Sequence, residues 1–218
     1  MAHSHPMPAK IFITDQLKAN VTRRDERANV EMAESITKRN DFDAVAEVAA
    51  HLGDRKLAAD CIKILYEVAE RKPELVAPHA EIFFELLDHK NNRLVWGAMS
   101  AIDQIASLRS DLVFSYLDKL SDVTEKGTVI TRDHFVNILV KLAATKDGII
   151  PLILEQLAGA PVNQFPMYAE RAAALFRDHD RAEFTAILRR RTPEMNTEAK
   201  RKRIARVQKS LGSTPTPR

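Results

Sequence analysis

The sequence is poor in the residues on which several classes of protein depend. It contains one cysteine and six glycines among 218 residues, and aromatic side chains make up only 6%. A single cysteine excludes an internal disulfide and any zinc cluster built from several cysteines. Six glycines leave little room for the glycine-rich loops that hold phosphate groups. The shortage of glycine and aromatic residues also disfavours a turn-rich β fold.

Long apolar segments are missing as well. No stretch approaches the roughly 18 uninterrupted apolar residues that cross a bilayer, and residues 1–24 lack the apolar core of a secretory signal. We therefore expect a cytoplasmic protein that does not enter a membrane. The apolar fraction is nevertheless 45%, which is enough for a packed core. Alanine, leucine, isoleucine and valine supply most of it, and this mixture favours packed helices.

The chain contains a repeat with a period of 37 residues. The segment KLAADCIKILYEVAERKPELV begins at Lys56 and aligns with RLVWGAMSAIDQIASLRSDLV, which begins 37 residues later at Arg93. The matched apolar columns are Leu57/Leu94, Cys61/Ala98, Ile62/Met99, Leu65/Ile102, Val68/Ile105, Ala69/Ala106, Leu75/Leu112 and Val76/Val113. A third copy fills the same columns with Phe135, Val136, Leu139, Leu142, Ala143, Ile149 and Ile150.

Each copy predicts a pair of helices. The apolar positions of the first half recur every three or four residues and form one face of a helix. The second halves span 76–88, 113–123 and 150–157, and their core columns are Ala80/Leu117/Leu154 and Phe83/Leu120/Leu157. The joints between halves, ERKPE, SLRSD and ATKDG, are short, so paired helices should be antiparallel neighbours.

Two prolines lie five residues apart in the first copy. Pro73 falls in the joint, and Pro78 is predicted to fall in the first turn of the second helix, where a missing N–H costs little.

Weaker copies flank the three clear ones. Residues 23–39 and 43–52 predict a pair before them, and residues 167–191 predict a pair after them with a shortened joint. A final helix is predicted over 197–211, with Ile204, Val207 and Leu211 on one stripe. The sequence therefore predicts an all-α domain over residues 21–211, built from about five antiparallel helix pairs. We expect an N-terminal segment over 1–20 and a disordered tail over 212–218.

The repeat resembles the HEAT/armadillo class of α-solenoid repeats. Glu74 is the acidic residue of the turn, Leu75 and Val76 form the apolar pair, 86–88 close the second helix with Leu-Leu-Asp, and the basic Arg93 opens the next repeat. The resemblance covers roughly residues 42–191 and implies a right-handed α-solenoid. The third copy departs from the pattern, because Ile130 stands where the others have Lys56 and Arg93.

The sequence offers no catalytic constellation. None of the seven histidines forms a helical i,i+4 pair with another, and no P-loop, Gly-x-Ser-x-Gly or His-Glu-x-x-His motif occurs. Cys61 shares its column with Ala98 and Phe135, which indicates a small core residue rather than a nucleophile. We therefore predict no enzymatic activity, no cofactor and no metal site.

Outward positions of the second helices carry acidic residues in register. Glu81, Asp118 and Glu155 share one column, and Glu85 and Asp122 share another. Second helices usually line the concave face of such solenoids, so the resemblance implies an acidic inner surface. Two interpretations remain open: a solvated face that keeps the protein soluble, or a groove for a basic segment of a partner.

Charge is distributed unevenly along the chain. Residues 41–160 carry a formal charge of −6 and residues 161–218 carry +7. The predicted polyanion-binding residues are Arg189, Arg190, Arg191, Lys200, Arg201, Lys202 and Arg203. Such a cluster attracts phosphates, but aromatic residues that would stack on bases are not interleaved with it. The alternative is a capping helix with a charged outer face.

Trp96 is the single tryptophan. Its column is not consistently apolar, because Ala59 and Asp133 occupy it in the other copies. Partial burial beside Met99 is one interpretation, and an aromatic anchor for a partner is the other.

These patterns predict a non-catalytic protein interaction or scaffold module. One alternative is a nucleic-acid-binding protein similar to the HEAT-like bacterial DNA-alkylation glycosylases, whose groove is basic and set with aromatic residues and a catalytic aspartate. The middle of this chain is acidic, and none of that family's site residues can be placed on it. A further alternative is an accessory subunit of an enzyme complex, as in the HEAT-like bilin lyases.

Overall fold

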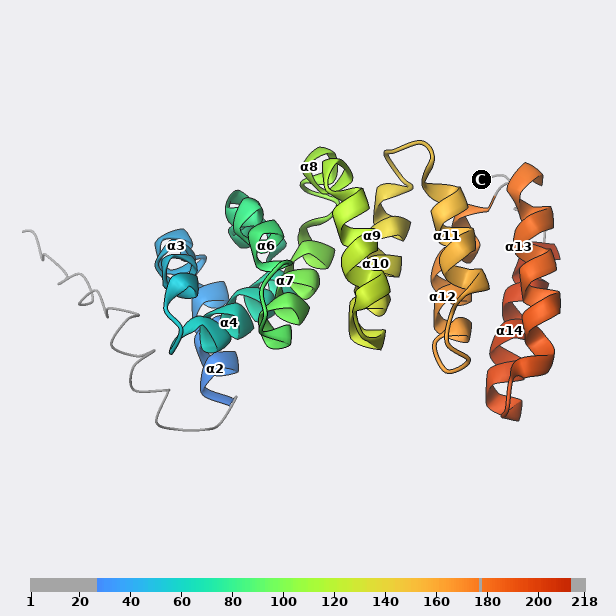
Figure 1. Ribbon diagram of the computed structural model, residues 1–218, viewed down its shortest axis with the longest axis horizontal. Coiled ribbons are helices and arrows are strands. Elements are labelled where there is room, and N and C mark those ends of the chain that lie inside the picture. Colours follow the sequence, from blue (N-terminus) through green and yellow to red (C-terminus); the bar gives the residue numbers. More distant parts are fainter. Residues whose placement is uncertain (1–26, 177, 213–218) are drawn as a thin grey trace, which may run out of the picture. The chain divides into compact units, whose positions relative to one another are not determined.

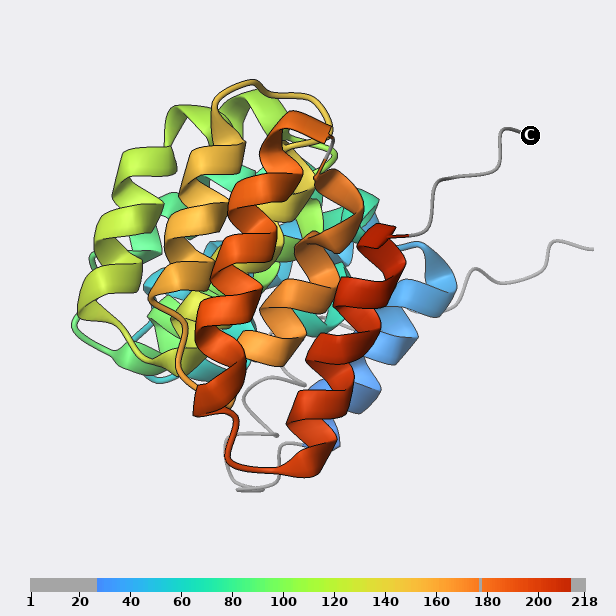
Figure 2. The ribbon, with the colours of Figure 1, turned by 90° about the vertical axis from the view of Figure 1, so that its right-hand side faces the viewer.

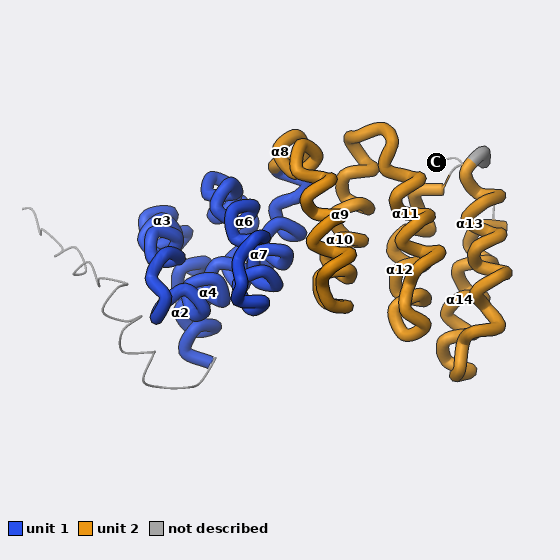
Figure 3. The backbone as a smooth tube through the Cα atoms, viewed as in Figure 1, with its two compact units in different colours: residues 1–108 blue, residues 109–218 orange. Residues whose placement is uncertain are grey.

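The computed structural model describes residues 27–176 and 178–212, with side chains left undescribed at 178 and 179, and every regular element in these ranges is a helix (Figure 1). The predicted N-terminal segment over 1–20, and all but the first residue of the predicted tail over 212–218, lie outside the described residues. The chain divides into two compact units, Met1–Leu108 and Arg109–Arg218 (Figure 3). The division falls within the predicted joint SLRSD, so one continuous domain over 21–211 stays a prediction.

Unit 1 consists of two layers of helices. Its helices are α2 (Arg27–Arg39), α3 (Phe42–Ala50), α4 (Ala58–Arg71), α5 (Pro73–Val76), α6 (Ala80–Leu86) and α7 (Asn92–Ile105). The central helix α4 packs against α2 on one side and α7 on the other, and these three form one layer. The second layer contains α3, α5 and α6, of which α5 contacts α3, α4 and α7 (Figure 1).

Unit 2 repeats this arrangement of alternating helices. Its helices are α8 (Ser110–Ser115), α9 (Leu117–Lys126), α10 (Val129–Leu142), α11 (Ile149–Ala158), α12 (Phe165–Ala172), α13 (Asp178–Arg191) and α14 (Glu198–Gly212). Helix α12 packs against α10 and α14, and α11 packs against α10, α12 and α13 (Figure 2). The final helix begins and ends one residue later than predicted, and its stripe of Ile204, Val207 and Leu211 is buried as expected.

The apolar columns found in the sequence form the cores of the two units. In α4, the side chains of Cys61, Ile62 and Leu65 have no exposed surface, and their repeat mates in α7 are equally buried. The residues at matched positions that remain partly exposed are Leu112, Leu117, Ala143 and Ile150. The predicted first-half helices are therefore confirmed as the elements that carry the core, because apolar spacing determines which side of a helix leaves water.

The second half of the first copy is not the single helix that the sequence predicts over 76–88. Helix α5 starts at Pro73, the first helical position, where a missing N–H is harmless. A 3₁₀ turn, Ala77–His79, then separates it from α6. Pro78 lies inside this turn rather than in the first turn of a continuous helix. Proline has no N–H to donate to the carbonyl four residues earlier, and its ring clashes with that carbonyl. A continuous α-helix is therefore interrupted here.

The other second halves show that the break does not follow from a common rule. In the second copy, α8 ends at Ser115 and α9 starts at Leu117 without any proline nearby. In the third copy, α11 is continuous although Pro151 is its third residue. A proline within the first turn removes an N–H that has no partner inside the helix, so α11 tolerates it.

Helices α4 and α7 approach closely at Gly97. A Cβ atom added there would lie 2.4 Å from Cγ1 of Ile62 and 3.3 Å from Cδ1 of Tyr66. Ile62 is fully buried and packed on all sides, so it has no free space into which it can retreat. The absence of a side chain at Gly97 therefore allows the two helices to touch.

We expect Gly97→Ala to lower the free energy of unfolding by about 2 kcal/mol, because the new methyl group overpacks the α4–α7 contact. Urea denaturation followed by circular dichroism measures this change. Gly53→Ala is the matched control, since an added Cβ at Gly53 meets nothing within 4 Å, and it should leave stability unchanged or slightly increased. Equal stabilities of the two variants would contradict the close approach.

Candidate partner-binding site

A metal site, a membrane span and a cysteine nucleophile each set requirements for the described residues. Within 27–176 and 178–212, no group of three or more histidine, cysteine, aspartate or glutamate side chains is placed to hold a metal ion. In the same ranges, no helix combines the length and the apolar character that a membrane span requires. Cys61 is fully buried in α4, and burial, together with the nearby Asp60 and Asp54, raises the pKa of its thiol to about 12. The thiol therefore stays protonated and lacks the character of a nucleophile.

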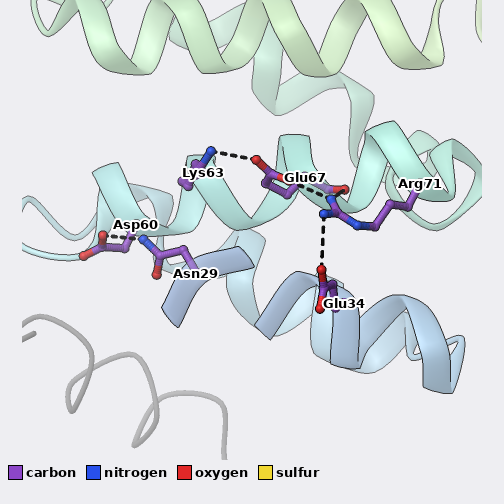
Figure 4. Close-up of polar contacts among 6 residues, drawn as sticks. All are labelled: Asn29, Glu34, Asp60, Lys63, Glu67 and Arg71. Carbon is purple, nitrogen blue, oxygen red and sulfur yellow. Dashed lines mark hydrogen bonds and ion pairs between the residues drawn. The ribbon is translucent and has the colours of Figure 1, made fainter. Parts of the chain in front are cut away.

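A chain of charged residues runs along α4 and onto α2 (Figure 4). Glu67 accepts a hydrogen bond of 2.6 Å from Lys63 Nζ and another of 2.6 Å from Arg71 Nη1. Arg71 also lies 3.7 Å from Glu34 of α2. The three α4 residues are spaced four apart, so they share one face of the helix.

Glu67 and Lys63 are held in their ionised forms. Burial alone would raise the pKa of Glu67, but the hydrogen bonds from Lys63 and Arg71 outweigh it and lower that pKa. Burial likewise opposes the charge of Lys63, but its hydrogen bonds to Glu67 and Tyr66 dominate and raise its pKa. A general acid near neutral pH needs the opposite shift in a carboxyl group. We therefore assign this network a structural role: it links successive turns of α4, and Arg71 extends it toward Glu34 of α2.

An open groove of about 380 Å³ lies between α11 and α13 in unit 2. Its apolar lining residues are Ile150, Pro151, Leu154, Ala158, Ala186 and Ile187. Its charged lining residues are Glu155, Asp180, Glu183 and Arg190. We call this feature the α11–α13 groove. It combines an apolar lining with three carboxylates and one guanidinium, so acidic groups outnumber basic ones.

The helical repeat explains why these side chains converge. Pro151, Glu155 and Ala158 lie three or four residues apart and form one stripe of α11. Asp180, Glu183 and Arg190 form the facing stripe of α13, with Ala186 and Ile187 between the charges. Leu157 and Leu188, on the neighbouring stripes, are fully buried, and α11 packs against α13.

The sequence placed only two of these charges in candidate sites. Glu155 was expected on the acidic face and Arg190 in the polyanion cluster, whereas the structure brings both to one groove. Asp180 and Glu183 were missed because the shortened joint before α13 breaks the 37-residue register. The spacing of Asp180, Glu183 and Arg190 along α13 was the available signal, since it places them on one face.

A second groove, of about 720 Å³, lies in unit 1. Its lining residues are Leu52, Gly53, Arg55, Ala58, Ala59, Ile82, Glu85, Leu86, His89, Lys90, Asn91 and Leu94. Glu85, another predicted acidic-face residue, faces this groove together with Arg55 and Lys90. Charges of both signs therefore surround it, and it selects less clearly for the charge of a partner than the α11–α13 groove does.

The remaining predicted acidic residues and the tryptophan are placed as follows. Glu81 is exposed on α6 in unit 1, and Asp118 and Asp122 are exposed on α9 in unit 2. Because the five acidic residues are divided between the units, their joining into one face stays a prediction. Trp96 is half-buried on α7, next in sequence to the close contact at Gly97.

The assignment of Arg191 to a polyanion-binding surface is wrong. Its side chain is buried, with 7% of the residue exposed. The guanidinium donates to the carbonyl oxygens of Leu157, Ala158 and Ala160 at 2.7–3.0 Å, and to the carboxylate of Glu194 at 2.7 Å. It also lies 4.8 Å from the ring centre of Phe165. Arg191 therefore caps the C-terminal end of α11, where unpaired carbonyls attract positive charge.

A second arginine completes this cap. Arg132 of α10 donates from Nη1 to the carbonyl oxygen of Gly159 at 2.8 Å. The carbonyls of four consecutive residues, 157–160, are thus satisfied by two arginines from different helices.

Two other predicted polyanion ligands hold α14 in place. Arg203 binds both carboxylate oxygens of Glu170 on α12 at 2.8 and 2.6 Å, and this hydrogen bonding lowers the pKa of Glu170. Lys200 donates to the side-chain oxygens of Asn163 and Asn196, at 2.5 and 2.7 Å. These contacts support the interpretation of α14 as a capping helix on its packed side. They leave its outward side to be explained.

No family model matches the chain, and no curated protein matches it either. Among solved structures, the crystal structure of an engineered protein from a structural genomics project is similar, with a TM-score of 0.65 and 14% sequence identity. The alignment covers 92% of this chain and 96% of that one. The likeness shows an all-α fold. At this level of identity it carries no information about function.

Proposed function

We propose that the protein is a non-catalytic interaction module of HEAT-like repeats, and that the α11–α13 groove receives a segment of a partner protein bearing apolar and basic side chains. The observation that carries the proposal is the groove itself: an apolar lining rimmed by three carboxylates and one arginine. The corresponding architecture is a right-handed α-solenoid of about five helix pairs. The 37-residue recurrence of buried columns supports it, because each pair then buries its apolar face against its neighbours.

Apolar contact supplies affinity in this scheme. Burying about 100 Å² of a partner's apolar side chain contributes roughly 2.5 kcal/mol. Leu154 and Ile187 are themselves largely covered, so the exposed apolar lining comes mainly from Ile150, Pro151, Ala158 and Ala186. A small apolar side chain of a partner matches such a shallow lining.

Charge supplies selectivity. Glu155 and Glu183 are exposed on facing helices, so a lysine or arginine of a partner can meet either without displacing a buried ion pair. Charge-assisted hydrogen bonds to these carboxylates favour a basic segment. An acidic segment is repelled by the same groups, which discriminates between partners.

We expect Glu155→Lys/Glu183→Lys to weaken binding of an amphipathic lysine–leucine peptide at least about tenfold, which corresponds to roughly 1.4 kcal/mol. Fluorescence anisotropy with the labelled peptide and the full chain measures the effect. A peptide of the same pattern with glutamate in place of lysine should not bind to the natural protein.

The control is Glu125→Lys/Asp147→Lys, which makes the same change in charge at exposed positions of unit 2 outside the groove. It should retain peptide affinity within about twofold, since exposed charges at a distance are screened. Equal weakening in both double variants would sink the assignment to the groove. Release of modified bases from alkylated DNA by the purified protein would sink the non-catalytic proposal.

A further inference from the structure

The hairpin formed by α13 and α14 carries the strongest concentration of positive charge in the chain. Residues 189–209 contain nine lysines and arginines against two glutamates. The nine are Arg189, Arg190, Arg191, Lys200, Arg201, Lys202, Arg203, Arg206 and Lys209. Arg191, Lys200 and Arg203 are engaged in the contacts within unit 2 described above, and Arg201 donates to the carbonyl oxygen of Met195 at 3.0 Å. The question therefore concerns the others.

The residues on the outward side are weakly held. Arg189 and Arg190 are exposed in the last turn of α13. Lys202 pairs with Glu198 at 2.7 Å, but the two side chains are 71% and 76% exposed. Such an exposed pair on one helix contributes little and exchanges readily for another partner. Arg206 donates a long hydrogen bond of 3.5 Å to the carbonyl of Lys202, and its charge also acts on Glu170 of α12.

These outward residues lie on the two helices of the hairpin, Arg189 and Arg190 at the end of α13, Lys202 and Arg206 on α14. The last turn of α13 and the first turns of α14 meet at the same end, because only residues 192–197 connect them (Figure 2). Lys202 and Arg206 are one turn apart on α14, a rise of about 6 Å along its axis. We name Arg189, Arg190, Lys202 and Arg206 the basic hairpin surface.

We propose that the basic hairpin surface binds the phosphate backbone of duplex nucleic acid. Lysine and arginine on an open surface neutralise phosphates and release their counterions, which is the main source of sequence-independent affinity. The geometry requires no groove, because a duplex presents its phosphates on its outside. This activity is separate from the proposed docking of a basic segment, although Arg190 borders both surfaces.

Other polyanions fit this surface less well. The large apolar side chains that the structure exposes in the described ranges are Phe42, Leu108, Phe114, Val129 and Ile130. None of them lies on α13 or α14, so this hairpin has nothing to insert into a lipid bilayer. The same absence of exposed aromatic rings on the described part of the hairpin removes the stacking platforms that single strands need.

The test is fluorescence anisotropy of the full chain with a labelled DNA duplex of about 20 base pairs, from about 50 to about 200 mM salt. The expected dissociation constant at the low-salt end is in the micromolar range. The logarithm of the association constant should fall with the logarithm of salt concentration with a slope of about −3 to −4, as expected for about four phosphates. Lys202→Glu/Arg206→Glu should weaken binding at least about tenfold and flatten the slope by about 2.

The matched control is Lys38→Glu/Lys126→Glu, which changes the net charge equally at exposed positions on α2 and at the end of α9. It should bind the duplex within about twofold of the natural protein. Thermal unfolding of both double variants establishes that they fold. The proposal is overturned if both variants lose affinity equally, if the hairpin variant binds as before, or if a single strand binds more tightly than the duplex. Binding to vesicles that contain phosphatidylserine, without binding to the duplex, also overturns it.

Discussion

Arg191→Ala should lower the free energy of unfolding by about 3–5 kcal/mol, the range typical when a buried, fully bonded charge is removed. The substitution removes the guanidinium from the carbonyls of Leu157, Ala158 and Ala160, where its bonds to Leu157 and Ala160 are buried, and it releases Glu194. Each unsatisfied buried polar group costs about 1–3 kcal/mol. The expected loss in melting temperature is of the order of 10 °C, which circular dichroism measures directly.

Two further variants test the reason for this loss. Arg189→Ala changes an exposed arginine two residues away, and it should shift the melting temperature by no more than about 2 °C. Arg191→Lys keeps the positive charge but replaces the planar guanidinium, which bonds three carbonyls at once, with a compact ammonium group. It should therefore recover only a small part of the stability that Arg191→Ala loses. If Arg191→Ala and Arg189→Ala have the same melting temperature, the buried cap does not stabilise the protein and this prediction is wrong.

Glu67→Gln is expected to destabilise the protein by about 3 kcal/mol. It removes the negative charge and leaves one acceptor oxygen for the two donors, each of whose charge-assisted bonds is worth roughly 1.5–3 kcal/mol, and partial exposure of Arg71 reduces the sum. Lys63, whose side chain is 13% exposed, is left without its carboxylate. Glu70→Gln, an exposed position on the same helix, is the control and should be nearly neutral. Chemical denaturation at neutral pH separates the two variants.

The same pair of variants predicts how stability depends on pH. The pKa of Glu67 is lowered in the folded state, so its contribution is complete above the unfolded value of about 4.5 and is lost as pH falls through the folded pKa. The difference in free energy of unfolding between the natural protein and Glu67→Gln should therefore shrink progressively below about pH 4.5. An advantage that instead vanished between pH 6 and 8 would point to a histidine rather than to Glu67.

The spacing of apolar residues was enough to predict the helices that carry the core. The core columns of α4, α7 and α10 follow from apolar spacing alone, and α14 was placed to within one residue. The breaks in the second helices were not predictable from spacing. Pro78 gave a local reason for one of them, but the break at Tyr116 has no proline and depends on packing that the sequence does not state.

Arg191 shows why the candidate site was less predictable. Three consecutive arginines look alike in composition, yet one is buried and its two predecessors are exposed. Burial was decided by the face of α13: Arg191 continues the stripe of Phe184 and Leu188, which are fully buried. That stripe was visible in the sequence, whereas the carbonyls that receive the guanidinium were not, because they lie 31–34 residues away in the chain.

The arginine cap on α11 also bears on the thermodynamics of docking. Arg191 belongs to α13 and grips the end of α11, so the two walls of the groove are locked together at that end before any partner arrives. A site that is preorganised in its bound geometry loses little binding free energy to conformational ordering. We therefore expect this end of the groove to behave as a rigid template, with partner selection decided by fit rather than by folding around the partner.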